Sequence, residues 1–233
     1  MACLAKNHEV IGVDKKPGVG VMQINILKEP EKFQQLLQPG DIIIHLAWDT
    51  KEHTTPMRPI IDDNKKMGEL VFDLALQKKA KLVIFASSVH ASMGHLLEFG
   101  YPDFNKKHRA YHIRKKIKAA DGFYPLGAYG ASKVYLEALG KAYSAKGLPV
   151  IAVRFGNVTP DNGFGEYPFW LSHRDCCQFI EKCCTVKGLP PFLTIFAISD
   201  NICNPFDNSE SQKILGFEPQ DSSPCPLINN ERR

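Results

Sequence analysis

The sequence predicts an α/β fold in which helices cover both faces of a doubly wound parallel sheet. Short runs rich in Val and Ile alternate along the chain with amphipathic stretches. The runs are apolar almost throughout rather than at every second residue, which is typical of strands covered on both faces. Repeated strand–helix–strand units of this kind form parallel sheets. The expected strands are residues 8–14, 20–26, 41–48, 81–88, 149–158 and 192–199.

Helical periodicity marks the stretches between several of these runs. Residues 62–80 and 132–144 each carry one apolar stripe at intervals of three and four residues, as an amphipathic helix requires. A further helix is expected to begin after Ser172. The Ser172 hydroxyl can accept a hydrogen bond from a free backbone N–H, and Asp175 follows three residues later.

Size and composition are those of an ordinary globular protein of one domain. The chain has 233 residues, of which 44% are hydrophobic and 23% charged. We expect no membrane helix, because no apolar run approaches about 20 residues. We expect a cytoplasmic location, because the first residues show no basic start followed by an apolar stretch. The net charge of +4 is too small to predict an anionic partner.

The cysteines offer no metal-binding pattern. Four of the seven form two adjacent pairs, Cys176–Cys177 and Cys183–Cys184, without a C-x-x-C motif or a His-containing zinc spacing. A spacing of seven residues puts both pairs on one helical face around Ile180. We therefore expect small, buried, reduced residues there and no metal site.

Two segments depart from the strand–helix rhythm. Residues 105–123 are strongly basic and have no apolar period, so we expect a solvated loop or lid. The alternative is an arm that binds phosphate or nucleic acid, although basic runs on enzyme surfaces are common and we expect no nucleic-acid partner. The tail from residue 218 on is expected to be frayed.

The stretch PLGAYGASKVYLEALGKAYS places Tyr129 and Lys133 four residues apart. On a helix these two positions share a face. A free phenol has a pKa of about 10, and a nearby cation lowers that value by stabilising the phenolate. Such a phenol can take a proton from a hydroxyl group, or return one, near neutral pH. The alternative is the polar first turn of an ordinary helix.

Four segments, FASSVHASMG, YGASK, VRFGNV and SDN, occur in an order and spacing that carry a family resemblance. Together they resemble the extended short-chain dehydrogenase/reductase family, the NAD-dependent epimerase/dehydratase group. The chain looks most similar to its uronate dehydrogenases, since FWLSHRD and the segment from AISDN to LGFEPQD are also similar. The resemblance implies a Rossmann-like sheet and hydride transfer between a sugar or sugar acid and NAD.

The resemblance also implies roles for individual residues. Tyr129 would be the acid/base, Lys133 its pKa-lowering and ribose-binding partner, and Ser88 a hydrogen-bond donor to the reacting oxygen. The residues expected near the sugar are Ser87, His90 and Asn157. The alternatives remain that serines at a strand end satisfy local backbone groups, that His90 is only a loop residue, and that Asn157 is structural.

The expected cofactor site begins with Asp14, which ends the strand HEVIGVD. An acidic residue there accepts hydrogen bonds from the adenosine ribose and repels a 2′-phosphate, which favours NAD over NADP. The resemblance implies further contacts from Asn25 and Ile26 at the adenine, from Leu46, Ala47 and Trp48 beside the pyrophosphate and ribose, and from Asn64. Asn64 would order a water beside Lys133, or it would simply suit a helix start.

The usual phosphate-binding fingerprint G-x-x-G-x-x-G is not found before Asp14. No glycine precedes Gly12, and Gly18 with Gly20 is expected to form a turn. The expected fold therefore lacks the usual first strand, whose two neighbours in the order 3-2-1-4-5-6 would lose their partner. Each buried backbone group left unpaired costs about 1–3 kcal/mol. Three alternatives follow: a truncated sequence, direct pairing of the two neighbours, or a strand from a partner.

Residues 1–233 are expected to form a single domain, with residues 1–158 as an incomplete dinucleotide-binding core and residues 159–233 as a substrate-side region. The leading function is an NAD-dependent dehydrogenase of a sugar or sugar acid, acting as a homodimer. A nucleotide-sugar epimerase is the alternative, although the region after Arg154 is short for it. A dehydratase is disfavoured by Val89 and His90, which replace an Asp-Glu pair. An inactive family member without a working NAD site also stays open.

The substrate carboxylate lacks an expected partner. Uronate dehydrogenases hold it with an Arg shortly before the WLS segment, whereas NVTPDNGFGEYPFWLS contains no Arg or Lys. Arg109 and Arg114 in the basic segment are the alternative cations.

Overall fold

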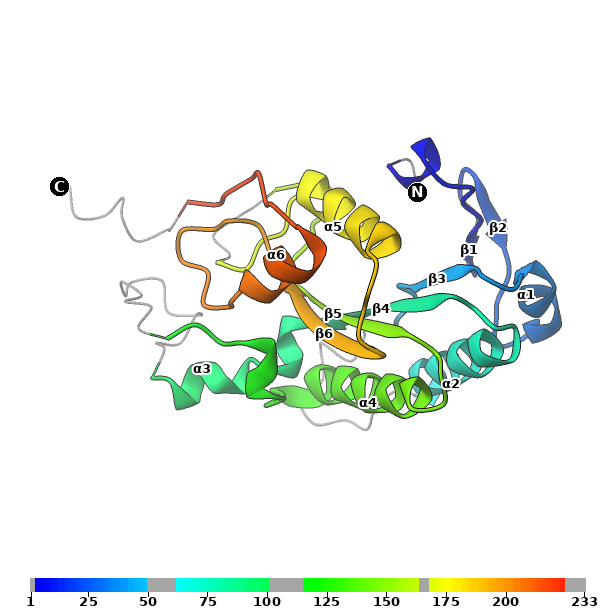
Figure 1. Cartoon of the computed structure of the whole chain (residues 1–233), viewed down its shortest axis with the longest axis horizontal. Helices are drawn as coiled ribbons and strands as arrows, with labels where there is room; N and C mark the ends of the chain where they lie inside the picture. The colour runs from blue at the N-terminus through cyan, green and yellow to red at the C-terminus, as the bar shows by residue number, and fades with distance from the viewer. Residues whose placement is uncertain (1–2, 50–61, 101–114, 164–167, 225–233) are drawn as a thin grey trace. The chain divides into compact units, whose positions relative to one another are not determined.

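The structure is a computed structural model that describes residues 3–49, 62–100, 115–163 and 168–224 (Figure 1). Its strands are β1 (Gly12–Asp14), β2 (Val21–Gln23), β3 (Ile42–His45), β4 (Leu82–Ser88), β5 (Val150–Phe155) and β6 (Phe192–Ala197). Its α-helices are α1 (Pro30–Leu36), α2 (Asp62–Gln77), α3 (Gly94–Glu98), α4 (Gly127–Ser144), α5 (His173–Thr185) and α6 (Ser209–Leu215). Short 3₁₀ turns are η1 (Leu4–Lys6), η3 (Val89–Ala91) and η4 (Ala119–Asp121). Every strand lies inside one predicted run, and the predicted α/β class is confirmed.

The strands form two sheets rather than one. Strands β3, β4, β5 and β6 form a four-stranded sheet in that order, while β1 and β2 form a separate parallel pair. Direct pairing of the strands on either side of the expected gap is therefore wrong, because β1 and β3 belong to different sheets. Val13 of β1 packs against the core cluster that contains Ile43 of β3. Apolar burial, not a shared backbone ladder, thus joins these two strands.

The chain divides into two compact units. The first unit contains residues 1–86, 127–152 and 187–193, and the second contains residues 87–126, 153–186 and 194–233. Strands β4, β5 and β6 each begin in a segment of the first unit and end in a segment of the second. The expected boundary after residue 158 stays a prediction.

In the first unit, α2 and α4 lie side by side on one face of β3 and β4 (Figure 1). Their close approach depends on Gly68 of α2, because a Cβ there would collide with the Leu136 side chain of α4. Phe72 of α2 and Phe85 of β4 are fully buried in the core cluster to which these helices contribute. This packing fixes the position of α4, which carries Tyr129 and Lys133.

The second unit has its own apolar core and a helix that begins where the sequence predicts. Its core cluster consists of Val89, Leu96, Ile117, Phe169, Phe196, Ile198 and Phe206. The Ser172 hydroxyl accepts a hydrogen bond from the Asp175 N–H at 3.0 Å, which confirms the predicted start of α5. Ile117 is fully buried and bridges to Phe206, so the predicted solvated loop over residues 105–123 is wrong at that residue. Burial of the apolar Ile117 side chain in this core is more favourable in free energy than its exposure to water.

The expected fraying from residue 218 on is wrong for the described part of the tail. Gln220 N–H donates to Asp175 Oδ1 at 2.8 Å, and Asp221 N–H donates to Oδ2 of the same carboxylate at 3.1 Å. The Asp221 carboxylate in turn pairs with Arg174 of α5. Asp175 is fully buried, so these tail N–H groups satisfy acceptors that would otherwise be costly to bury.

The cysteine pairs on α5 are free thiols. Cys183 and Cys184 are buried as predicted, and burial raises the pKa of the Cys183 thiol, which keeps it protonated. Cys176 and Cys177 are only half-buried. Cys203, outside these pairs, takes part in a disulfide bond.

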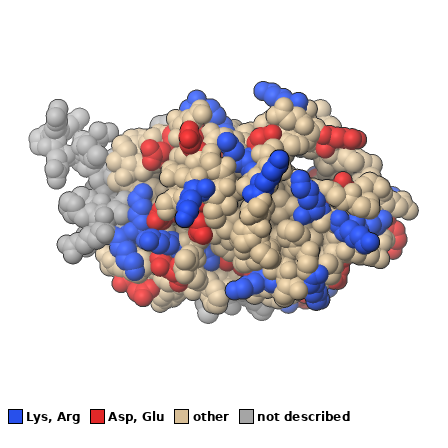
Figure 2. Space-filling view, in the orientation of Figure 1, with Lys and Arg blue, Asp and Glu red and all other residues tan. Residues whose placement is uncertain are grey.

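Basic and acidic side chains are interspersed on the face shown in Figure 2. On this face (Figure 2) the described residues form a mixture of both signs, which matches the small net charge of the chain. Most of the basic segment, with Arg109 and Arg114, lies outside the described residues. Within the described part of the chain, no helix is long and apolar enough to cross a membrane.

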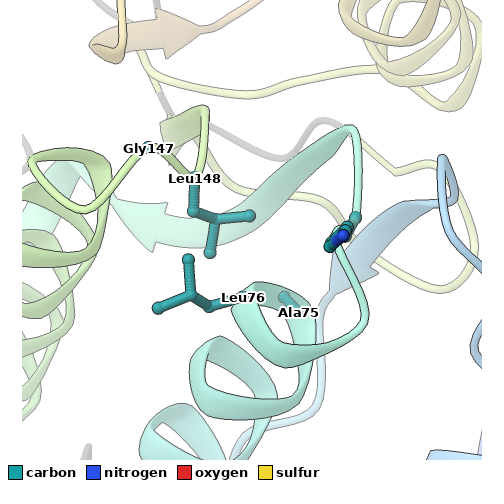
Figure 3. A pocket seen from close by; sticks show the side chains of 6 residues that line it. Ala75, Leu76, Gly147 and Leu148 are labelled. Carbon is teal, nitrogen blue, oxygen red and sulfur yellow. The ribbon is translucent and has the colours of Figure 1, made fainter.

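A small hollow of about 170 Å³ lies at the C-terminal end of α2. Leu76 and Leu148 line it and point toward each other (Figure 3). The lining contains none of the residues proposed for catalysis or for cofactor binding. We therefore assign it no function.

The replacement Phe72→Ala should lower the free energy of unfolding by about 3–5 kcal/mol. Phe72 is fully buried, meets Phe85 edge-on with ring centroids 5.7 Å apart, and stacks on Tyr143 at 5.4 Å. Urea denaturation followed by circular dichroism measures the change. The exposed Val19→Ala is the control and should stay within about 0.5 kcal/mol of wild type. A loss below about 1 kcal/mol for Phe72→Ala would contradict this packing.

Candidate active site

The candidate site in the first unit lies at the carboxyl ends of two neighbouring parallel strands. Strand β3 pairs with β4 in register from Ile42 opposite Leu82 to His45 opposite Phe85. The residues that follow His45 and the last residues of β4 therefore reach the same edge of the sheet. Ligands of open α/β sheets bind outside this edge.

Helix α4 brings Tyr129 and Lys133 to one another. Gly127 begins the helix with φ of +73°, a left-handed conformation that glycine adopts without a steric penalty. Tyr129 lies in the first turn, and the Ser132 hydroxyl donates to its carbonyl at 2.7 Å. The Lys133 Nζ atom lies 5.5 Å from the centroid of the Tyr129 ring. The two side chains share one face of α4, as their spacing predicts.

The Lys133 ammonium is buried at the sheet edge, with only 2% of the residue exposed. It donates a hydrogen bond to the Ala86 carbonyl of β4 at 2.8 Å. It also lies 3.8 Å from the centroid of the Trp48 ring, within the range of a cation–π interaction. Trp48 follows β3 by three residues, so both strands contribute to holding this charge.

Asn64 in the first turn of α2 holds the chain directly after Trp48. Its Oδ1 accepts a hydrogen bond from the Asp49 N–H at 2.8 Å, and its Nδ2 donates to the Asp49 carbonyl at 3.0 Å. Asn64 is fully buried, and these two bonds satisfy both ends of its amide. The proposed water beside Lys133 stays a prediction.

His45, at the end of β3, is a site residue that the sequence reasoning missed. It is 6% exposed, and its Nε2 has no hydrogen-bond partner among the described residues. Burial lowers the pKa of His45 from 6.5 to about 4, and the nearby Lys133 charge acts in the same direction. The imidazole is therefore neutral at pH 7. The sequence feature that could have identified His45 is its position as a lone polar residue in the apolar run IIIHLAW.

The three tyrosines of α4 differ in the charged groups that lie near them. Tyr135 donates to Glu69 Oε1 at 2.5 Å, and this bond raises the pKa of Tyr135 to about 12. Burial and a hydrogen bond to Asp73 raise the pKa of Tyr143 to about 12. The buried Lys133 ammonium lies near the Tyr129 ring, whereas the ammonium near the Tyr143 ring, at 4.8 Å from its centroid, belongs to the exposed Lys146. The carboxylates keep the other two phenols protonated, whereas a cation favours a phenolate.

The residues expected at the adenine end lie on and after β1 and β2. Asp14 is exposed at the end of β1, and its Oδ1 accepts a hydrogen bond from Lys16 N–H at 2.8 Å. Asn25 Oδ1 accepts from Leu27 N–H at 3.1 Å, which forms a local turn. The Ile26 side chain packs against the core cluster.

Leu46 and Ala47, expected beside the pyrophosphate, are both exposed after β3. Gly18 bridges to Val21 and closes the connection between β1 and β2, which confirms that this glycine belongs to a turn.

The residues expected near the sugar belong to the second unit. Ser88 ends β4, and its Oγ accepts from His90 N–H at 3.2 Å and lies 3.1 Å from His90 Nδ1. Ser87 is 2% exposed. Asn157 is half-buried and bridges through its backbone to Trp170. The structure thus brings Ser88 and His90 together, and their placement against Tyr129 stays a prediction.

The buried His45 should make the protein less stable in acid. The unfolded chain takes up a proton at the usual histidine pKa of 6.5, whereas the folded chain does so only near 4. Stability should therefore fall as the pH drops from about 6.5 to about 4, by about 3 kcal/mol from this residue. Urea denaturation across this range measures the slope, which His45→Phe should flatten.

The exposed His173 of α5 provides the control for this measurement. His173→Gln should keep the wild-type slope. An unchanged slope in His45→Phe would show that another group causes the acid sensitivity.

Comparison with known proteins relates the chain to sugar-converting enzymes. An NAD-dependent glucose-6-phosphate dehydrogenase of Haloferax volcanii is 29% identical over 186 residues, covering 78% of this chain and 68% of that protein. The solved uronate dehydrogenase from Agrobacterium tumefaciens has a TM-score of 0.72 at 23% identity, covering 94% of this chain and 78% of that one. A UDP-glucuronic acid 4-epimerase from Bacillus cereus, in complex with UDP-glucuronic acid and NAD, has a TM-score of 0.70 at 16% identity, covering 95% and 90%. The two solved structures share the fold.

A family profile covers most of the chain. The NAD dependent epimerase/dehydratase family matches residues 1–168. This range includes β1 to β5 and helix α4 with its Tyr129 and Lys133. The chain therefore belongs to the NAD dependent epimerase/dehydratase family.

Proposed function

We propose that the chain is an NAD-dependent oxidoreductase of a sugar or sugar acid, with Tyr129 as its acid/base. The observation that carries this proposal is the contrast among the tyrosines of α4. Tyr135 and Tyr143 bond to carboxylates, and the ammonium near the Tyr143 ring belongs to the exposed Lys146, whereas the ammonium near the Tyr129 ring is that of the buried Lys133. The family membership and the dehydrogenase relative support the same reaction class.

In the proposed reaction Tyr129 takes the proton of the sugar hydroxyl group that is oxidised. The Lys133 ammonium stabilises the phenolate form that accepts this proton. NAD supplies the hydride acceptor when it is bound. Ser88 would donate a hydrogen bond to the reacting oxygen, and its contact with His90 holds the serine hydroxyl in place.

Asp14 and Lys133 are the residues proposed to hold the two riboses of NAD. The Asp14 carboxylate is exposed at the end of β1, where it can accept hydrogen bonds from the adenosine ribose. Lys133 is proposed to donate hydrogen bonds to the nicotinamide ribose, and Leu46, Ala47 and Trp48 are proposed beside the pyrophosphate and ribose. Asn25 and Ile26 remain proposed at the adenine, with Ile26 contributing through its backbone because its side chain is committed to the core.

The substrate-side residues and the assembly complete the proposal. Ser87, His90 and Asn157 are proposed at the sugar, which would be a uronate or another sugar acid, or a sugar such as glucose 6-phosphate. We also propose a cytoplasmic homodimer. A nucleotide-sugar epimerase is the second candidate, because a UDP-glucuronic acid 4-epimerase shares the fold over 95% of this chain.

The replacement Tyr129→Phe should lower kcat by about 10²–10⁴-fold, because it removes the group that exchanges the proton. NADH formation with glucuronate, galacturonate, glucose 6-phosphate and arabinose, followed by absorbance, measures the rate. Binding of NADH, followed by its fluorescence, should stay near wild type. Tyr135→Phe on the same helix is the matched control and should keep the wild-type kcat. Equal rates for both variants would reject Tyr129 as the acid/base.

The replacement Asp14→Ala should weaken NAD binding about tenfold and reduce the preference for NAD over NADP. The carboxylate is proposed to accept the ribose hydroxyls and to repel a 2′-phosphate. Titration with each coenzyme measures both effects. The exposed Asp63→Asn in α2 is the control. Unchanged affinities for both coenzymes would remove Asp14 from the site, and absence of NAD binding to the wild type would favour an inactive family member.

A further inference from the structure

The indole of Trp48 lies over the Lys133 ammonium, which also donates a hydrogen bond to a backbone carbonyl. We propose that Trp48 is a gate over Lys133, whose indole must leave the ammonium before Lys133 can donate hydrogen bonds to a ligand. This inference rests on the proposed function only for the identity of that ligand, NAD. The contact between the Trp48 indole and the Lys133 ammonium is formed by the chain itself and does not depend on the proposed function.

The contacts of the ammonium explain why the indole is a cover. Nζ donates a hydrogen bond to the Ala86 carbonyl at 2.8 Å. The Trp48 ring centroid is 3.8 Å from Nζ, closer than the Tyr129 ring at 5.5 Å. At that distance the electron-rich face of the indole attracts the ammonium. Lys133 is only 2% exposed, so a ligand approaching over the indole has no access to its donors.

The backbone that carries the indole is fixed. Asn64 binds both the N–H and the carbonyl of Asp49, the residue next to Trp48. The Trp48 side chain, by contrast, is only partly buried against the core cluster of the first unit, so the core does not enclose it. The gate therefore opens by rotation of the Trp48 side chain, while the loop keeps its place.

A covered Lys133 lowers the apparent affinity for any ligand that needs it. When only a fraction of molecules has the indole moved aside, the apparent Kd equals the intrinsic Kd divided by that fraction. Removing the indole should therefore expose Lys133 and strengthen binding. If Trp48 only stabilised the fold, its replacement would weaken ligand binding.

The first test measures the exposure of Lys133 without any ligand. Wild type, Trp48→Leu and Trp48→Phe are pulsed with an amine-acetylating reagent, and acetylation is followed by peptide mass spectrometry. Lys133 in Trp48→Leu should react about tenfold faster than in wild type. Trp48→Phe keeps an aromatic face and should lie between them, as expected for a cation–π cover. Lys141, exposed on the same helix, is the internal reference and should react equally in all three proteins.

Thermal unfolding and the controls keep the result interpretable. All three proteins should unfold cooperatively. Val19 is a fully exposed residue of the same unit, and in Val19→Ala Lys133 should be acetylated as slowly as in wild type. A folded Trp48→Leu protein in which Lys133 stays slow would overturn the gate. If Trp48→Leu fails to fold, Trp48→Phe decides, since a rate equal to wild type with the smaller ring would also overturn it.

The second test uses NADH and separates the gate from the proposed function. Trp48 and Trp170 are the two tryptophans of the chain, so fluorescence lost in Trp48→Leu belongs to Trp48. Binding of NADH to wild type should shift the Trp48 signal, and Trp48→Leu should bind NADH about fivefold or more tightly. A reactive Lys133 with no NADH binding in any variant would support the gate and reject the proposed function. NADH binding with a Trp48 signal that does not move would reject the gate.

Discussion

The buried charge of Lys133 is the constraint around which the candidate site is built. An ammonium with 2% exposure needs partners, because an unpaired buried charge is strongly destabilising. The Ala86 carbonyl and the face of Trp48 supply such partners from the ends of β4 and β3. Burial lowers the pKa of His45, and the Lys133 charge acts in the same direction. The buried ammonium thus contributes to the electrostatics of the sheet edge.

The packing of α2 against α4 positions that charge and sorts the tyrosines. Gly68 allows the two helices to approach closely, and Asn64 at the start of α2 fixes the chain after Trp48. Glu69 of the same helix accepts a hydrogen bond from the Tyr135 hydroxyl. The acidic side chains of α2 thereby hold two tyrosines of α4 in the protonated form. Tyr129, one turn before Lys133, is the tyrosine that we propose as the acid/base.

The second unit is organised by a buried carboxylate. Asp175 accepts hydrogen bonds from the Ser199 hydroxyl at 2.6 Å and from two N–H groups of the tail. Arg174 adds an ion pair to Asp221. These bonds hold residues 218–221 against α5, although most of these residues stay exposed or half-buried. Burial of the carboxylate makes this arrangement specific, because each unmade bond would be costly.

The sequence by itself determined the strands, the start of α5 and the shared face of Tyr129 and Lys133. These features follow from apolar runs, capping chemistry and helical spacing, which depend on neighbouring residues only. Only the tertiary structure decided that Trp48 covers Lys133, that His45 is buried beside it, and that β1 and β3 lie in separate sheets. Each of these depends on contacts between residues far apart in the chain, and local periodicity carries no information about which distant side chain fills a given place.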